Sequence, residues 1–354
     1  MKATAQAVTL PATAIDVGFF STKQTLGRQA NKDSSEILVA QFPSIAPRIT
    51  GGLQSFSLGA EHEGVLLEVE PGVHHYVGKD VLNTSNSFGT RAVVSNFSES
   101  ASYKALFLGA LFYLARHQKV GSTLIIKMLA VGLPMSTIFS HSKSLQMLVT
   151  GEHTIPHPSN PGSFIQVVVQ NAMVVAQPQG ALINHGVSKY GKPSDMNSLV
   201  LDMGGGTFDW FVSKGIFPNK LRCGAAPIGA LACATAVCSQ IHPELQNDHE
   251  IMARVDAALS SGAETVRITG RDYRMADYWP AVRGVLQDAV EQMQKSVGLL
   301  RNIDTILLTG GGSRMLSKVI GKMLPDFAHM IEMDEEPVFS NVRGFHVIAE
   351  RQAV

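Results

Sequence analysis

The sequence has no excess of charge of either sign. Among its 354 residues, 29 Lys and Arg balance 29 Asp and Glu, so the formal net charge at pH 7 is zero. A neutral chain produces no long-range field that concentrates DNA, RNA or an anionic lipid surface. Direct nucleic-acid binding is therefore not expected, and such a partner would have to be reached through a local patch or a second protein.

Cysteine is also scarce. Cys223, Cys233 and Cys238 have no CxxC spacing and leave one thiol over in any disulfide scheme. This usage fits a reducing cytoplasm. We interpret the three residues as buried apolar thiols rather than metal ligands.

Long hydrophobic runs are missing, and so is a secretory leader. The longest apolar run, Ala105–Ala115, is well short of the roughly 20 residues that cross a bilayer. It predicts a core helix and no membrane association. The first residues hold one lysine and no continuous apolar stretch before a small-residue cleavage site. With 45% hydrophobic and only 16% charged residues, the composition is that of a soluble globular protein.

What the sequence does contain is an alternation of strand-like and helix-like segments. Strand patterns occur at Ala12–Thr25 (two strands around a glycine turn), Ile37–Phe42, Val65–Val69, His74–Val77, Thr123–Val131, His153–Ile155, Phe164–Ala176, Leu199–Met203, Thr207–Val212 and Thr305–Thr309. Helical patterns occur at Ser100–Gln118, Thr137–Val149, Pro178–Val187, Ile228–Ile241, His249–Ser260, Tyr278–Leu300, Met315–Leu324 and Val338–Ala349. The alternation predicts an α/β protein, and the length predicts about two domains. The polar segment Gly191–Asn197 is the best boundary between them.

One sequence motif occurs in both halves of the chain. Ala14–Gly18, followed by Ser21, Thr22 and Lys23, is an apolar strand ending in Asp16, a spacer, glycine and then hydroxyl residues. Val200–Thr207 repeats this order around Asp202. Glycine turns expose convergent backbone N–H groups that bind phosphate oxygens, and an aspartate at the strand end can hold a hydrated divalent ion beside them. A single Asp-x-Gly is common in structural turns, but two copies in this setting favour phosphate binding.

A third glycine-rich turn follows the strand of Ile303–Thr309. Its sequence, TGGGSRM, allows close approach of a flat or phosphorylated ligand at the start of a helix, although a tight strand-to-helix turn would look the same. The chain has no GxxxxGK[ST] motif and no GxGxxG after a strand, so P-loop and Rossmann sites are excluded. We therefore predict that two facing hairpins bind the phosphates.

The ordered motifs resemble those of a known superfamily. IDVGFFSTK, VGLPMS, VAQPQGAL, LVLDMGGGTFDW, LLTGGGSRM and FSNVRGF are similar to the actin, Hsp70 and sugar-kinase superfamily, and within it to bacterial actin-like ATPases of the ParM/StbA plasmid-segregation type. The protein D component of the PRTRC plasmid-associated system is also similar. The resemblance implies a two-lobed actin-like (ribonuclease H-like, duplicated) fold with ATP or GTP and Mg2+ in the cleft. Lobe I would span residues 1–190, with a C-terminal helix at 338–354 packing back on it, and lobe II would span 191–337.

The same resemblance implies roles for individual residues. Asp16 and Asp202 would orient the water shell of the magnesium ion, and Lys23 would reach the phosphates. The groups that would supply amides and hydroxyls are Gly18, Ser21, Thr22, Gly204, Gly205, Gly206 and Thr207. The groups that would lie against the adenosine are Gly310, Gly311, Gly312 and Ser313. Gln179, where some relatives have glutamate, would position the attacking water through hydrogen bonds; it could instead be a polar residue at a helix start.

Other polar residues give weaker signals. His74, His75, His153 and His157 lack a matching ligand set, which disfavours a metal site. Asp209, Asp272 and Asp277 are candidates for a kinase base, and their spacing singles out none of them.

Four functions remain to be compared. The first is a nucleotide-gated filament with slow ATP hydrolysis as a timer, which reaches plasmid DNA through an adaptor protein. The second is a small-molecule kinase, disfavoured because Gln179 stands where a catalytic carboxylate would be expected. The third is a non-polymerising nucleotide switch of chaperone type, disfavoured because only about 40 residues follow the adenosine motif. The fourth, an actin-like protein that shapes membranes, would need a basic amphipathic anchor at the N-terminus.

Overall fold

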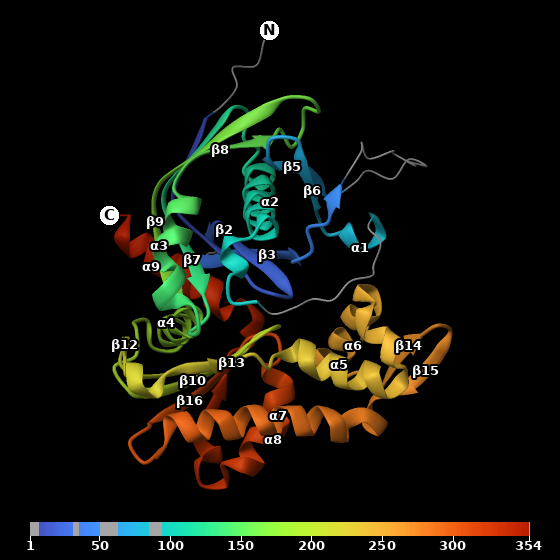
Figure 1. The fold of residues 1–354 in the computed structure, drawn as a ribbon. Coiled ribbons are helices and arrows are strands. Elements are labelled where there is room, and N and C mark those ends of the chain that lie inside the picture. The colour runs from blue at the N-terminus through green and yellow to red at the C-terminus, as the bar shows by residue number, and fades with distance from the viewer. Residues whose placement is uncertain (1–6, 31–34, 50–62, 85–93, 354) are drawn as a thin grey trace.

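The computed structural model describes residues 7–30, 35–49, 63–84 and 94–353, which form two stacked α/β lobes (Figure 1). The sheet of lobe I has the order β3-β2-β1-β7-β9-β8, in which β1, β7 and β9 are parallel neighbours. Its strands are β1 (Val8–Val17), β2 (Ser21–Ala30), β3 (Ser35–Pro43), β7 (Thr123–Leu133), β8 (Gly151–Pro156) and β9 (Phe164–Ala176). A second small sheet contains β4 (Arg48–Ile49), β5 (Val65–Glu70) and β6 (Val73–Val77).

Helices cover both faces of the lobe I sheet. α2 (Ala101–His117) is apolar nearly all round, so it is buried between the main sheet and the small sheet. α3 (Ile138–Val149) packs on β9, and α9 (Ser340–Gln352) packs on β1 and β7. The remaining short elements of this lobe are α1 (Val81–Thr84) and the 3-10 turn η1 (Phe97–Glu99).

Lobe II is built around a five-stranded path, β12-β11-β10-β16-β17, with β13 on the side of β11. The strands are β10 (Asn197–Met203), β11 (Phe208–Lys214), β12 (Phe217–Pro218), β13 (Gly224–Ala226), β16 (Thr305–Thr309) and β17 (Ile331–Met333). Its helices are α5 (Ala230–Ile241), α6 (His249–Ser261), α7 (Met275–Val297) and α8 (Ser313–Met323), and the hairpin β14 (Thr265–Ile268)–β15 (Arg271–Arg274) lies at its end. The short 3-10 turns are η2 (Lys220–Arg222), η3 (Pro243–Asn247), η4 (Pro325–Met330) and η5 (Pro337–Phe339).

Two helices join the lobes. α4 (Gln177–Tyr190) packs along α9 and also contacts β10, β11 and β16 of lobe II. The helices cross where Gly180 meets Gly344; a Cβ on Gly344 would lie 1.8 Å from the Gly180 carbonyl oxygen. α4 therefore belongs to the hinge, and a boundary between residues 190 and 191 stays a proposal.

The central expectations for the fold are confirmed. All the strands and helices predicted above are present, with ends shifted by a few residues. The 265–274 hairpin, β13, β17 and the 3-10 turns were not predicted. No helix in the described parts of the chain is both long and apolar enough to cross a membrane.

Candidate functional site

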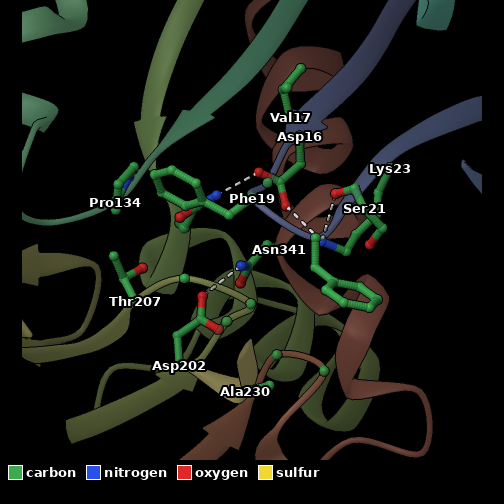
Figure 2. Close-up of a pocket in the computed structure, with 18 of the residues that line it drawn as sticks. Asp16, Val17, Phe19, Ser21, Lys23, Pro134, Asp202, Thr207, Ala230 and Asn341 are labelled. Atoms are coloured by element: carbon green, nitrogen blue, oxygen red, sulfur yellow. Dashed lines mark hydrogen bonds and ion pairs between the residues drawn. The ribbon is translucent and has the colours of Figure 1, made fainter. Parts of the chain in front are cut away.

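A cleft of about 970 Å³ lies between the lobes and is lined by both acid-bearing hairpins. Figure 2 shows Asp16 and Asp202 on opposite sides of this pocket, with Asn341 between them. Its volume is at the upper end of the range of pockets that bind small ligands, about 300–1,000 Å³.

The first hairpin connects β1 and β2. Gly18 N–H donates to the carbonyl oxygen of Ser21 at 3.2 Å, which closes the turn. The register places Lys23 beside Asp16, and their Nζ and Oδ2 atoms are 3.6 Å apart. Asp16 is 1% exposed and accepts a 2.7 Å hydrogen bond from Gln177 Nε2. A buried carboxylate is thus held by a cation and an amide at the cleft wall.

The second hairpin has the same geometry. Gly204 N–H donates to the carbonyl oxygen of Thr207 at 2.9 Å. The N-terminus of α5 fastens this turn from behind, since the N–H groups of Ala230 and Leu231 donate to the carbonyls of Gly204 and Gly205, both at 2.9 Å. The turn is therefore anchored to α5, and Gly204–Thr207 line the cleft.

Asp202, the acid of the second hairpin, carries an unfavourable charge. Its Oδ2 accepts from Asn341 Nδ2 at 2.7 Å, whereas its buried Oδ1 has no hydrogen-bond partner among the described residues. Burial, opposed by the Asn341 hydrogen bond and reinforced by the Asp16 charge, raises the pKa of Asp202 to about 6. Such a carboxylate is suited to binding a cation, because a nearby positive charge would offset both the cost of burial and the repulsion from Asp16.

The two hairpins touch across the cleft. A Cβ on Gly205 would lie 2.5 Å from Cβ of Phe20 and 3.0 Å from its backbone N, so only glycine fits there. The two bends, far apart in sequence, thus form one site.

The first part of the third glycine motif lies in the cleft wall, and the rest lies in the core. Gly310 has φ +84°, and a Cβ on it would lie 2.3 Å from Asp202 Oδ1, so this position requires glycine. Gly310, Gly311 and Arg314 line the cleft. Gly312 and Ser313 lie behind this wall; Gly312 N–H donates to the carbonyl of Met203 at 2.9 Å, and Ser313 is fully buried.

Besides Gly312 and Ser313, two further candidates from the sequence lie outside the cleft lining. Gln179 donates through Nε2 to the carbonyl oxygen of Ile216 at 3.1 Å, between the hinge helix and lobe II. Thr22 is buried and bonds Ser44 Oγ at 2.9 Å. Residues two apart on a helix point in nearly opposite directions. When Gln177 faces Asp16, Gln179 must therefore face away, and the glutamine at the cleft is Gln177.

The sequence interpretation missed several residues of the site. Gln177 and Asn341 lie in the motifs VAQPQGAL and FSNVRGF, but neither motif indicates that their side chains bond Asp16 and Asp202, which are 161 and 139 positions away. Asp209 was not missed, since it is one of the three candidates for a kinase base; it is buried, and its Oδ1 accepts from Met135 N–H of lobe I at 2.5 Å. Burial and the charge of Asp202 raise the pKa of Asp209 to about 7. Asp209 does not line the cleft, and its hydrogen bond with Met135 ties the lobes together.

The histidines make ordinary structural contacts. His75 Nδ1 is 2.7 Å from the Ala46 carbonyl oxygen, and His153 Nε2 is 3.1 Å from that of Val149. His157 Nδ1 accepts from Ser159 N–H at 3.0 Å. Within the described residues, no three His, Cys, Asp or Glu side chains gather in a way that could hold a metal ion directly.

Two α/β lobes, each contributing a glycine hairpin with a terminal aspartate to a shared cleft, define the actin-like class of proteins. The comparisons agree. Residues 14–180 match the family model "Actin like proteins N terminal domain", and residues 200–322 match "Archaeal actin homologue MreB-like, C-terminal". The two models together cover most of the chain, so the chain has an N-terminal and a C-terminal domain of the actin-like kind.

Solved structures place its fold near ParM. The apo pSK41 ParM protein is 18% identical with a TM-score of 0.67, covering 96% of this chain and 97% of that one. The ParM of a 15-stranded filament from Clostridium botulinum is 18% identical with a TM-score of 0.68, covering 96% and 99%. The archaeal actin homologue Ta0583 in complex with ADP is 18% identical with a TM-score of 0.69, covering 96% and 99%. These likenesses show a ParM-type fold.

Proposed function

We propose that this chain binds ATP or GTP with Mg2+ between its lobes and hydrolyses it slowly. The observation that supports the proposal is that the two hairpins, which carry Asp16 and Asp202, contact each other across one cleft. Gly205 and Gly206, with the side chains of Ser21 and Thr207, line the place for the phosphates, while the N–H groups of Gly18 and Gly204 close the two turns. Lys23 supplies positive charge from lobe I.

The residues present fit a magnesium ion held through water. Asp16 and Asp202 are two carboxylates on opposite sides of the cleft, and the unpartnered Oδ1 of Asp202 is an acceptor without a donor among the described residues. When bound, the ion would neutralise phosphate charge in the transition state. Gly310 and Gly311 would lie against the nucleoside, close to Arg314.

We assign the positioning of the attacking water to Gln177. Its Nε2 donates to Asp16 Oδ1, which fixes the side chain and leaves the amide oxygen as an acceptor for a water proton. A glutamine orients water without removing its proton outright, which suits a slow hydrolysis that serves as a timer.

Self-association into filaments is the second part of the proposal, and a group of exposed apolar side chains supports it. The apolar patch consists of Phe139, Leu221 and Leu299, which are 66%, 92% and 76% exposed. Lys220 lies 5.2 Å from the ring centroid of Phe139, and Arg222 donates to the Leu299 carbonyl, so the patch spans both lobes. A contact there would sense closure of the cleft. We propose a second copy of the chain as its occupant, and plasmid segregation in the cytoplasm through a DNA-binding adaptor as the role.

Sedimentation with a parallel product assay tests the function. The wild-type protein should pellet with ATP or GTP and Mg2+ and release phosphate, whereas Asp202→Ala should do neither. A phosphorylated small molecule formed without pelletable polymer would support the kinase instead. Nucleotide hydrolysis with no polymer at any protein concentration would indicate the non-polymerising switch.

A further inference from the structure

One carboxylate outside the cleft contacts both segments that join the lobes. The described chain passes from lobe I to lobe II through α4 and returns through a connector, residues 334–339, that leads from β17 to α9. Asp334 begins this connector. Its Oδ1 accepts from His185 Nδ1 at 2.8 Å, and its Oδ2 accepts from Asn184 Nδ2 at 2.9 Å, both on α4. Its Oδ2 also accepts from the hydroxyl of Ser340, the first residue of α9, at 2.6 Å.

The carboxylate of Asp334 is a charged acceptor for these three donors. Burial works against its ionisation, but the hydrogen bonds from His185, Ser340 and Asn184 hold the pKa of Asp334 below its usual value. Ser340 is fully buried and Asn184 is 8% exposed. Hydrogen bonds to an ionised group are stronger than those between neutral groups, so this junction has a well-defined geometry.

The junction continues directly into the nucleotide cleft. Ser340 is followed by Asn341, whose Nδ2 donates to Asp202 Oδ2 at 2.7 Å (Figure 2). Residues 335–338 of the connector line the cleft as well. The first turn of α9 is therefore bonded to Asp334 by one residue and to the acid of the second hairpin by the next.

The start of α9 depends on this contact. Its N-cap residue is Phe339, which makes no side-chain cap hydrogen bond. Asp334 places a negative charge at this helix N-terminus, where the helix dipole favours it. Since Ser340 and Asn341 are neighbours in one turn, the direction of the Asn341 amide depends on how Ser340 is held.

We propose that Asp334 is a positioning residue of the nucleotide site: through Ser340 it fixes the first turn of α9 and so holds Asn341 against Asp202. The inference rests on the proposed function, because Asp202 is the acid assigned to the hydrated Mg2+. Asp334 does not line the cleft, so it acts only through the residues that it bonds. Because the same carboxylate binds α4, the orientation of that helix is coupled to the site.

The first test is proton–nitrogen NMR of the Asn341 side-chain amide in the full chain without nucleotide. Its signals are assigned by their absence in Asn341→Ala. In the wild-type protein, the proton donated to Asp202 should be shifted downfield and protected from exchange. Ser340→Ala removes one hydroxyl and should abolish both the shift and the protection. The matched control is Ser213→Ala on β11, which removes an equally buried hydroxyl without a hydrogen-bond partner among the described residues and should leave the signal unchanged.

The second test is nucleotide affinity with and without Mg2+. Changing a group that orients a metal ligand typically costs 10–100-fold in metal affinity, and Asp334 acts one step further away. Ser340→Ala and Asp334→Asn should therefore reduce the gain in affinity from Mg2+ by about three- to tenfold. The affinity without Mg2+ should be unchanged. A general loss of folding stability would weaken both affinities together, so this split identifies a positioning role.

An unchanged Asn341 signal in both variants, its loss in Ser213→Ala as well, or an undiminished gain from Mg2+ would overturn the proposal. In Asp334→Asn an amide N–H2 group would face one of the three donors, so this second variant keeps the test decisive even if Ser340→Ala fails to fold. If the wild-type chain bound no nucleotide, the proposed function would fail. The NMR comparison would still decide whether Asp334 holds Asn341, so the two failures are distinguishable.

Discussion

Asp202 is a buried acid whose charge destabilises the empty protein. Its pKa is about 6 in the folded chain, above the usual value of 3.8, because burial and Asp16 disfavour the carboxylate. A raised folded pKa means that the folded state binds the proton more tightly than the unfolded state. The cost is therefore absent below pH 3.8, grows as the pH rises through about 6, and is complete above it.

Asp202→Asn should consequently stabilise the nucleotide-free protein, by up to about 3 kcal/mol at pH 8 and by less at pH 5. The amide keeps an acceptor for Asn341 and removes the charge. Thermal unfolding of both proteins at the two pH values measures this. The explanation fails if the stability difference between them does not increase with pH. The same variant should lose nucleotide binding, because the carboxylate is what would hold the hydrated cation.

Alanine substitutions of the two glutamines of α4, Gln177 and Gln179, can be compared directly. Gln177→Ala should lower the hydrolysis rate by at least about tenfold, because a positioned water is lost, while nucleotide affinity stays within a few-fold. Gln179→Ala, two residues further on, removes only the bond to Ile216 and should hydrolyse at the wild-type rate. Single-turnover phosphate release separates the two. The reverse order of effects would return the water-positioning role to Gln179.

At the scale of single residues, local sequence patterns predict the two acids and Lys23, but not the amide side chains that bond the acids. Asp16, Lys23 and Asp202 follow from strand and turn patterns, and the structure brings all three to the cleft. The choice between Gln177 and Gln179 depends on the rotation of α4 about its axis, which a single helix start does not define. Asn341 reaches Asp202 only through the packing of α9, a tertiary contact with no local signal.

The elements that matter most for coupling the lobes are α4 and α9. Their backbones meet at Gly180 and Gly344, where a Cβ on Gly180 would lie 2.5 Å from the Phe345 ring and one on Gly344 would strike the Gly180 carbonyl. Backbone atoms cannot yield as a flexible side chain can. This crossing therefore allows no side chain.

Gly344→Ala should destabilise the protein by about 3 kcal/mol or more, at the upper end of overpacking effects, because the helices must separate. Gly284→Ala is the control, since Gly284 is also inside a helix, α7, but has nothing within 4 Å of its Cβ position. That change should stabilise by about 0.5–1 kcal/mol. Denaturant unfolding measures both. Equal effects of the two substitutions would show that the crossing is not close-packed.

Elements with a strong apolar pattern were predictable, and short strands without such a pattern were not. α2 and β7 have apolar patterns of 17 and 11 residues, which local periodicity identifies. The strands β14 and β15 have four residues each and include Arg267, Arg271 and Arg274, whose polarity gives no strand pattern. β17 has three residues and pairs with β16. Such strands depend on tertiary pairing rather than on their own composition.

At the scale of the whole molecule, the apolar patch should control assembly separately from nucleotide binding. Leu221 is 92% exposed, so Leu221→Lys costs little folding stability but places a charge in the proposed contact. We expect polymer in the pellet to fall at least about tenfold while nucleotide affinity is unchanged. Undiminished polymer from this variant would place the self-association surface elsewhere.

The central claim is that the two hairpins with Asp16 and Asp202 together bind a nucleoside triphosphate and Mg2+. Calorimetric titration with ATP and GTP, each with and without Mg2+, tests it most directly. The wild-type protein should take up one equivalent of at least one nucleotide, more tightly with Mg2+. Asp16→Asn and Asp202→Asn should each lose the magnesium-dependent part. A well-folded wild-type protein that takes up neither nucleotide, or that binds equally with and without Mg2+, would contradict the account.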